Sequence, residues 1–178
     1  MNSDIATVLF NEGTIEKKIR ELGHQLSIDY EGKEPVVIGI LNGAVVFMTD
    51  IIRNIRTSLT IDFLSLSSYG SGTKSSGIVK IRKDIDTNLE NRHVIVIEDI
   101  VDTGLSLKYL LEYLNKHKPA SLKTCILLDK PKAHKVDIHI DYKGFEIGNE
   151  FVVGYGLDFD EKYRNLPYIG ILKKEIYS

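Results

Sequence analysis

Apolar residues recur at helical spacing in three stretches of the chain. The first stretch predicts a helix with its N-cap at Thr14 and its end near Gly32, and its apolar face would consist of Ile15, Ile19, Leu22 and Leu26. The second stretch covers residues 44–55, and the third covers residues 106–115. Each has apolar side chains every three or four residues, so we expect three amphipathic helices.

Short apolar runs rich in β-branched residues lie between these helices, and such runs are typical of buried strands. The predicted strands are residues 36–41, 59–66, 78–81, 94–97 and 122–128. Shorter runs predict a small additional lobe, and they are residues 138–140, 151–153 and 168–172. Because strands that alternate with helices indicate βαβ units, the sequence predicts an α/β fold with a mainly parallel sheet flanked by helices.

The composition is that of an ordinary globular domain. The chain has 178 residues, of which 43% are apolar and 27% are charged, so we predict a single domain over residues 1–178. Its small lobe would come from the C-terminal part, with the N-terminus as a further candidate. The net charge of −2 argues against a nucleic-acid surface, which is usually basic.

Several absences favour a cytoplasmic protein. No apolar run is long enough to cross a membrane, and the first residues do not resemble a secretory signal. The only cysteine is Cys125, so an intrachain disulfide is excluded.

Polar residues follow the apolar run at residues 94–97 in a pattern that favours anion binding. Thr103, Gly104 and Ser106 open the third predicted helix, whose first backbone N–H groups have no partner inside the helix. These donors and the positive end of the helix dipole suit a phosphate group. Because open α/β sheets bind ligands beyond the carboxyl ends of their strands, we expect a phosphate site here.

Three carboxylates in the same segment, Glu98, Asp99 and Asp102, would repel a phosphate group. They are explained if a hard cation such as Mg²⁺ lies between them and the phosphate, or if they accept hydrogen bonds from a ribose. The alternative is an acidic first turn that complements the helix dipole. That alternative explains one carboxylate but not an adjacent pair, so we favour a site for a phosphorylated ribose and a divalent metal.

These residues belong to a recognisable motif. Residues 94–106 resemble the phosphoribosyl-pyrophosphate motif of type I phosphoribosyltransferases, in which an acidic pair follows an apolar strand and precedes Asp-Thr-Gly or Asp-Ser-Gly. Five further segments resemble the hypoxanthine–guanine members of that family, and they are residues 41–44, 68–69, 128–131, 151–158 and 163–166. The resemblance implies the type I phosphoribosyltransferase fold with a small hood lobe that binds the purine. It also implies purine salvage, in which the 5-phosphoribosyl group passes from phosphoribosyl pyrophosphate to hypoxanthine or guanine and gives IMP or GMP and pyrophosphate.

The resemblance also implies roles for single residues around phosphoribosyl pyrophosphate. Asp102 would be the catalytic base for the purine N7 proton, and Glu98 and Asp99 would contact the ribose hydroxyls and the metal. Residues 102–106 would hold the 5′-phosphate. The full set of implied contacts to this substrate is Leu41, Asn42, Gly43, Ser68, Tyr69, Glu98, Asp99, Asp102, Thr103, Gly104, Leu105, Ser106 and Arg164.

Three members of this set have alternative interpretations, and two others are joined by a peptide with an implied geometry. Arg164 would clamp pyrophosphate as a planar fork, and a surface salt bridge is the alternative. Ser68 and Tyr69 would begin a lid over the reactants, and a plain hairpin connection is the alternative. The peptide between Leu41 and Asn42 would be cis, and Asn42 replaces a basic residue that some relatives carry.

The resemblance places the purine near the end of the chain. Lys130 would donate to the purine O6, and this favours an oxo group over an amino group because lysine is only a donor. Phe151 would stack on the base, although a core aromatic is the alternative, and Val152 would act through its backbone. Asp158 would lie at the purine end and help to hold Mg²⁺, which is the implied cofactor. The complete set of implied metal-site residues is Glu98, Asp99 and Asp158.

Other functions remain open at this point. The chain could transfer phosphoribose to another base such as xanthine, or it could be a regulator that senses phosphoribosyl pyrophosphate and binds nucleic acid. A regulator of that kind should have a basic face, which this chain lacks. We therefore expect small-molecule substrates, no nucleic-acid or membrane partner, and a homo-oligomer such as a dimer or tetramer.

Overall fold

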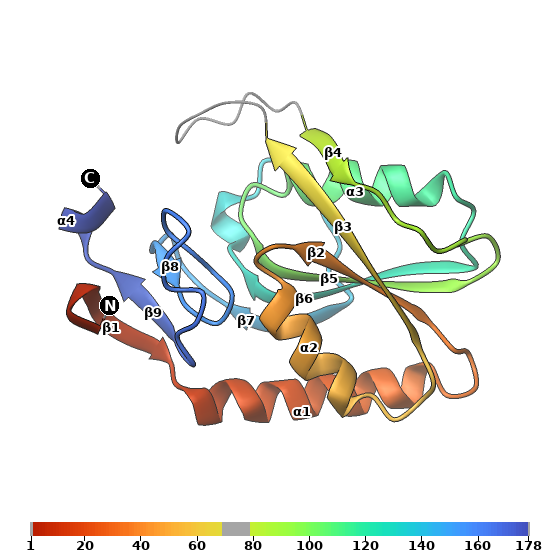
Figure 1. The fold of residues 1–178 in the computed structure, drawn as a ribbon, viewed down its shortest axis with the longest axis horizontal. Helices are drawn as coiled ribbons and strands as arrows, with labels where there is room; N and C mark the ends of the chain where they lie inside the picture. Colours follow the sequence, from red (N-terminus) through yellow and green to blue (C-terminus); the bar gives the residue numbers. More distant parts are fainter. Residues whose placement is uncertain (1, 69–78, 178) are drawn as a thin grey trace.

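The computed structural model describes residues 2–68 and 79–177. Within these ranges, a central sheet has six strands in the order β4-β3-β2-β5-β6-β7 (Figure 1). All neighbouring pairs are parallel except β3 and β4. The prediction of an α/β fold with a mainly parallel sheet is therefore confirmed. The strands are β2 (Val36–Leu41), β3 (Thr60–Ser68), β4 (Val79–Lys83), β5 (His93–Val101), β6 (Ser121–Asp129) and β7 (Tyr142–Glu146).

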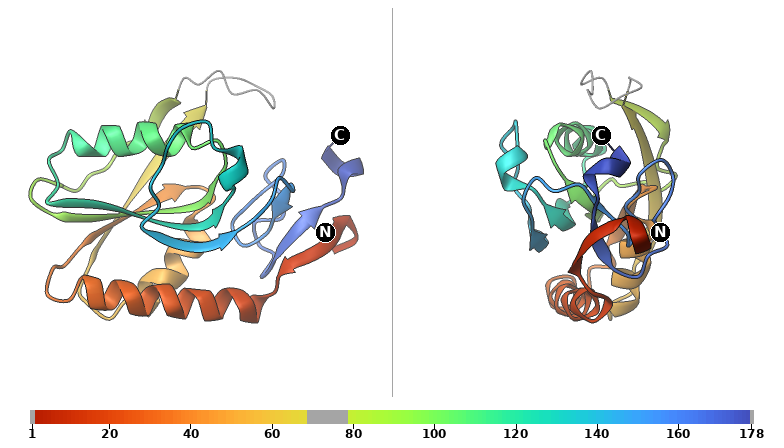
Figure 2. Two further views of the ribbon diagram at one scale, coloured as in Figure 1. Left: turned by 180° about the vertical axis from the view of Figure 1, so that it is seen from behind. Right: turned by 90° about the vertical axis from the view of Figure 1, so that its left-hand side faces the viewer.

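Helices cover both faces of this sheet. The helices α1 (Glu12–Asp29) and α2 (Val45–Asn54) pack on one face, and α3 (Leu105–Asn115) packs on the other (Figure 2). Side chains of β5 alternate between the two cores, with Ile95 and Ile97 facing α1 and α2 and with Val94 and Val96 facing α3. This explains why the strand is apolar at every position from 94 to 97.

A smaller sheet forms a lobe beyond the carboxyl ends of the main strands (Figure 2). Its order is β1-β9-β8, and both pairings are antiparallel. The first strand of the chain therefore lies beside the last. The elements of this lobe are the 3-10 turn Asn2–Asp4, β1 (Ile5–Phe10), β8 (Val152–Val153), β9 (Ile169–Leu172) and the short helix α4 (Lys174–Tyr177).

Three local predictions were wrong. The side chain of Asn11, not Thr14, caps α1 by accepting from the Thr14 N–H at 2.9 Å. The helix ends at Asp29, three residues before Gly32. No strand forms at residues 138–140, because Ile138 packs against Gly104 at the start of α3 instead of entering the sheet.

None of the described helices combines the length with the apolar character that a bilayer crossing needs.

Candidate active site

The loop that follows β2 lies between the acidic pair and the lobe. The peptide between Leu41 and Asn42 is cis, as the resemblance implied. A Cβ atom at Gly43 would clash with the carboxylate of Asp99, and the backbone of Gly156 in the lobe packs against the Gly43 carbonyl. The lack of a side chain at Gly43 therefore lets β5 approach this loop closely. The lack of a side chain at Gly156 does the same for the lobe.

The acidic pair lies inside β5 and not after it. The sequence predicted a strand that ends at residue 97, but β5 continues to Val101. Because successive side chains of a strand point to opposite faces, Glu98 and Asp99 face different surroundings. Glu98 lines a pocket with residues of the 102–107 loop, and Asp99 faces Gly43.

Burial changes the acidity of both carboxyl groups. Burial, with a further contribution from the charge of Asp99, raises the pKa of Glu98 to about 8. Burial also raises the pKa of Asp99 to about 6, although backbone N–H groups and the charge of Arg164 oppose the change. The Oε2 atom of Glu98 is buried and has no hydrogen-bond partner among residues 2–68 and 79–177. A desolvated carboxylate pair in which one oxygen atom of Glu98 has no partner fits a divalent cation with oxygen ligands.

The 102–106 loop forms a small anion-sized pocket. Gly104 is the N-cap residue of α3 with φ at 80°, and no side chain caps the helix. The pocket has a volume of about 130 Å³. Its lining includes Glu98, Asp102, Thr103, Gly104 and Ser106. The side chain of Asp102 is exposed at its edge.

The segments that carry two of the predicted purine residues, Lys130 and Phe151, meet near this pocket. Lys130 Nζ donates to the carbonyl of Glu150 at 2.9 Å, so Lys130 reaches the residue that precedes Phe151. Val152 is buried in β8. The backbone of the lysine segment also meets the phosphate loop, because Lys130 N donates to Val101 O and Lys135 N donates to Thr103 O, both at 2.9 Å.

Arg164 and Asp158 pair with each other at the edge of the lobe. Arg164 NH1 lies 3.0 Å from Asp158 Oδ1 and donates to the Gly156 carbonyl at 2.9 Å, and NH2 lies 3.1 Å from Glu161. No group of three metal-ligating side chains lies together within the described ranges. A cation at Glu98, Asp99 or Asp158 would therefore also need oxygen ligands from substrate or water.

Part of the predicted site lies outside the residues that the structure describes. Ser68 ends β3, and its side chain is not described. Tyr69 and the rest of the predicted lid lie outside the described residues.

Comparison with known proteins identifies the family. The family model for the phosphoribosyl transferase domain matches residues 7–160. The chain belongs to the phosphoribosyltransferase family. This phosphoribosyltransferase is 52% identical to the hypoxanthine-guanine phosphoribosyltransferase of Streptococcus thermophilus over 178 residues, which are 100% of this chain and 99% of that protein.

Further relatives of this phosphoribosyltransferase carry related names. It is 54% identical over 178 residues to the bifunctional protein TilS/HprT of Listeria monocytogenes, and it spans 28% of the length of that relative. The crystal structure of a hypoxanthine phosphoribosyltransferase from Staphylococcus aureus superposes with a TM-score of 0.96 and 51% identity, covering 100% of this chain and 97% of that one. The predicted type I phosphoribosyltransferase fold is therefore confirmed.

One charged cluster of this phosphoribosyltransferase was missed in the sequence. Asp129, at the end of β6, is only 1% exposed. Its Oδ1 lies 2.7 Å from His134 Nε2, and its Oδ2 lies 2.7 Å from Lys143 Nζ. The side chain of His134 is 18% exposed. The one available signal was an aspartate at the end of an apolar run, which needs a partner when buried.

The buried carboxylate of Glu98 predicts a stability that depends on pH. Its ordinary pKa is 4.5 and its folded pKa is about 8, so the folded state binds the proton more tightly and loses stability as the pH rises between these values. The full shift corresponds to about 5 kcal/mol, and solvent at the pocket should reduce this to about 2 kcal/mol. Glu98→Gln should therefore unfold at a higher temperature than the wild type above about pH 8 and equally near about pH 4.

Thermal unfolding of the ligand-free protein across this pH range measures the effect. Glu90→Gln, at an exposed position, is the control and should follow the wild type at every pH. If the unfolding temperature of Glu98→Gln exceeded that of the wild type by the same amount at every pH, the buried carboxyl group of Glu98 could not be the cause.

Proposed function

We propose that this phosphoribosyltransferase transfers the 5-phosphoribosyl group of phosphoribosyl pyrophosphate to hypoxanthine or guanine in purine salvage. The observation that carries the proposal is a pair of backbone hydrogen bonds between the lysine segment, residues 130–135, and the start of the phosphate loop. Lys130, the candidate purine donor, and Lys135 donate backbone hydrogen bonds to Val101 and Thr103. A base at Lys130 and a phosphate group in the 102–106 loop would therefore share one site, and relatives with matching names support this assignment.

The substrate would lie across the carboxyl ends of β2 and β5. The N–H groups at the start of α3 would hold the 5′-phosphate, and the backbone around Asn42 and Gly43 would hold the pyrophosphate. Arg164 would add a bidentate clamp, for which its pairing with Asp158 would have to open. Holding both reactants in line lowers the barrier to attack at C1′, where the transition state should resemble an oxocarbenium ion.

The acidic pair would serve the ribose and a metal. Glu98 and Asp99 would accept hydrogen bonds from the ribose hydroxyls and hold Mg²⁺, and Asp158 would contribute to a second ion. Bound Mg²⁺ would neutralise charge on the pyrophosphate as it leaves. The orphaned Oε2 atom of Glu98 supports this role, because a ligand that binds there would satisfy it.

Asp102 would take the N7 proton of the purine as N9 attacks. Its side chain is exposed at the rim of the phosphate pocket. Within residues 2–68 and 79–177 this side chain forms no hydrogen bond or ion pair that would compete with a substrate. A carboxylate in this position can accept a proton from a base held by Lys130 and Phe151.

The base preference would come from Lys130. Lys130→Ala should raise the KM for hypoxanthine by about 10-fold or more, because a donor to the purine O6 is lost. The KM for phosphoribosyl pyrophosphate should change little. Steady-state kinetics with each substrate varied in turn measures both values, and Lys132→Ala, an exposed lysine in the next turn, is the control. An unchanged profile of bases in Lys130→Ala would refute the role.

We also propose a cytoplasmic homo-oligomer with no nucleic-acid or membrane partner. Exposed apolar side chains on α2 and β3, namely Val45 at 38% and Ile61 at 48% exposure, support self-association. The net charge of −2 supports the absence of a nucleic-acid partner.

A spectrophotometric assay tests the proposed function. The full chain is mixed with phosphoribosyl pyrophosphate, Mg²⁺ and one of hypoxanthine, guanine, xanthine, adenine or uracil. Turnover of hypoxanthine or guanine is expected. Turnover of xanthine alone would favour the alternative base, and no turnover together with binding of phosphoribosyl pyrophosphate would favour the regulator.

A further inference from the structure

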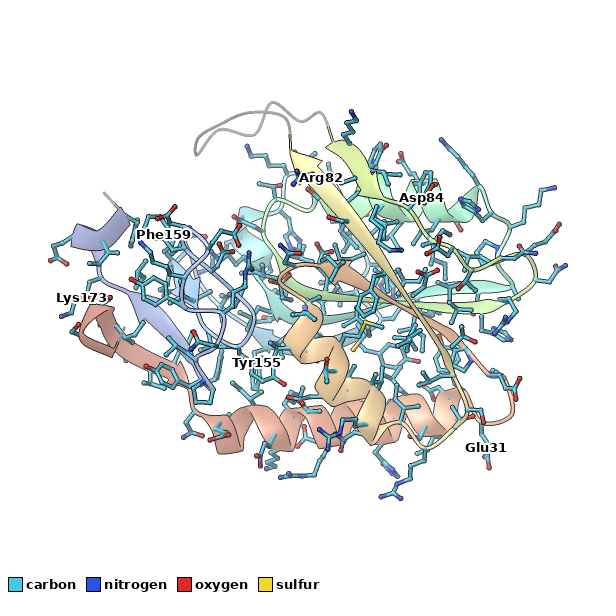
Figure 3. The ribbon with its side chains drawn as sticks, in the orientation of Figure 1. Glu31, Arg82, Asp84, Tyr155, Phe159 and Lys173 are labelled. Carbon is cyan, nitrogen blue, oxygen red and sulfur yellow. The ribbon has the colours of Figure 1, made fainter. Side chains whose placement is uncertain are left out.

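The C-terminal helix places an aromatic ring on the candidate base-stacking residue. The rings of Tyr177, on α4, and Phe151 are stacked with centroids 4.8 Å apart and an interplanar angle of 23°. Phe159 stands at 90° to Phe151 with a centroid distance of 5.6 Å. The three rings form one cluster at the outer end of the lobe, and Figure 3 labels Phe159 beside α4. Two neighbours therefore restrain Phe151 before any base arrives.

Backbone hydrogen bonds hold α4 in this place. Leu172 N donates to Phe151 O at 2.9 Å, so the end of β9 lies beside the base-stacking residue. The next residue, Lys173, donates its N–H to Asp4 O at 2.9 Å and ties the chain to the N-terminal turn. The Ile176 N–H then bonds to Lys173 O at 3.1 Å and starts the helical turn that carries Tyr177. The position of the tyrosine ring thus follows from the pairing of the lobe strands.

The direction of approach separates the tyrosine from the substrate. Lys130 follows β6, so it approaches Phe151 from the side of the main sheet. Its side chain donates to the carbonyl of Glu150, the residue before Phe151. The helix α4 lies at the opposite, outer end of the lobe (Figure 1). A stacked aromatic ring uses one face of Phe151 and leaves the other face for a second planar partner.

We propose that Tyr177 is a positioning residue for the purine: it packs behind Phe151 and fixes the plane on which the base stacks. This inference rests on the proposed function. A ring that is already held in its binding orientation loses less conformational freedom when the ligand binds. The effect is confined to base affinity, because the acidic pair and the phosphate pocket lie on other elements.

Substitutions at Tyr177 test this role by kinetics. Tyr177→Ala should raise the KM for hypoxanthine about 5-fold to 10-fold, with kcat and the KM for phosphoribosyl pyrophosphate within about twofold of the wild type. Tyr177→Phe keeps the stacked ring and should restore the wild-type KM. Tyr177→Leu keeps most of the apolar volume without an aromatic plane, and it should behave like Tyr177→Ala while preserving the packing of α4. Ile176→Ala, in the same helix and 38% exposed, is the matched control.

Three results would overturn the inference. A lower KM for hypoxanthine in Tyr177→Ala would show that the tyrosine occupies the face that the base needs. An unchanged KM for the base would show that the tyrosine does not position Phe151. An equal rise of the KM for hypoxanthine and of the KM for phosphoribosyl pyrophosphate in Tyr177→Leu would show a merely structural role. Absence of turnover in the wild type would instead overturn the proposed function, and the inference with it.

Discussion

Asp102→Asn will lower kcat by about 100-fold or more, because the amide cannot accept the purine N7 proton in the transition state. Binding of phosphoribosyl pyrophosphate should change only a few-fold. The asparagine has the same shape as the aspartate, and the side chain is exposed rather than part of the packed loop. The backbone donors at the start of α3 are therefore retained.

Steady-state kinetics and calorimetric titration with phosphoribosyl pyrophosphate separate the two effects. Asp137→Asn, at another exposed aspartate outside the phosphate loop, is the control and should retain the wild-type kcat. Loss of phosphoribosyl-pyrophosphate binding in a folded Asp102→Asn protein would show that Asp102 serves mainly to bind substrate.

Asp129→Ala will destabilise the fold by about 2 kcal/mol, because it leaves the partly buried His134 without its acceptor and removes one of the two acceptors of Lys143. Asp129 is 1% exposed and lies 2.7 Å from both His134 and Lys143. The same change removes the contact that ties His134 to the end of β6, beside Lys130. We therefore expect a raised KM for the base in addition to the lower stability.

Chemical denaturation measures the loss of stability. Asp160→Ala is the matched control, because it removes an ion pair to Lys162 whose side chains are 74% and 67% exposed. Exposed pairs contribute about 0.5 kcal/mol or less, so the control should unfold close to the wild type. Equal effects of the two substitutions would contradict the assignment of Asp129 as a buried anchor.

The sequence predicts the central strands well because both of their faces are buried. The predicted strand at residues 36–41 matches β2 in full. Two strands were not predicted, and both lie at the edge of a sheet. No residue of β1 and no residue of β7 is fully buried. Edge strands have little apolar periodicity, so their pairing depends on neighbours that the local sequence does not reveal.

The site could be predicted in its residue types but less well in its geometry. Charged residues inside a strand contradict the apolar pattern, so the prediction ended β5 at residue 97, although Glu98 and Asp99 belong to it. Such local conflicts are expected where function, and not packing, selects the residue. The pairing of Arg164 with Asp158, and of His134 with Asp129, joins side chains whose contact no spacing rule predicts.

The pairing of β1 with β9 has a consequence for synthesis on the ribosome. β1 is synthesised before the main sheet, yet its only partner in the small sheet, within the part of the chain described, is β9, which is synthesised after the main sheet. The main sheet and the 102–106 loop can form while the chain is still growing. The surface around Phe151 is completed only when residues 169–172 are free. A nascent chain stalled before Ile169 would thus carry a phosphate pocket without a finished base pocket.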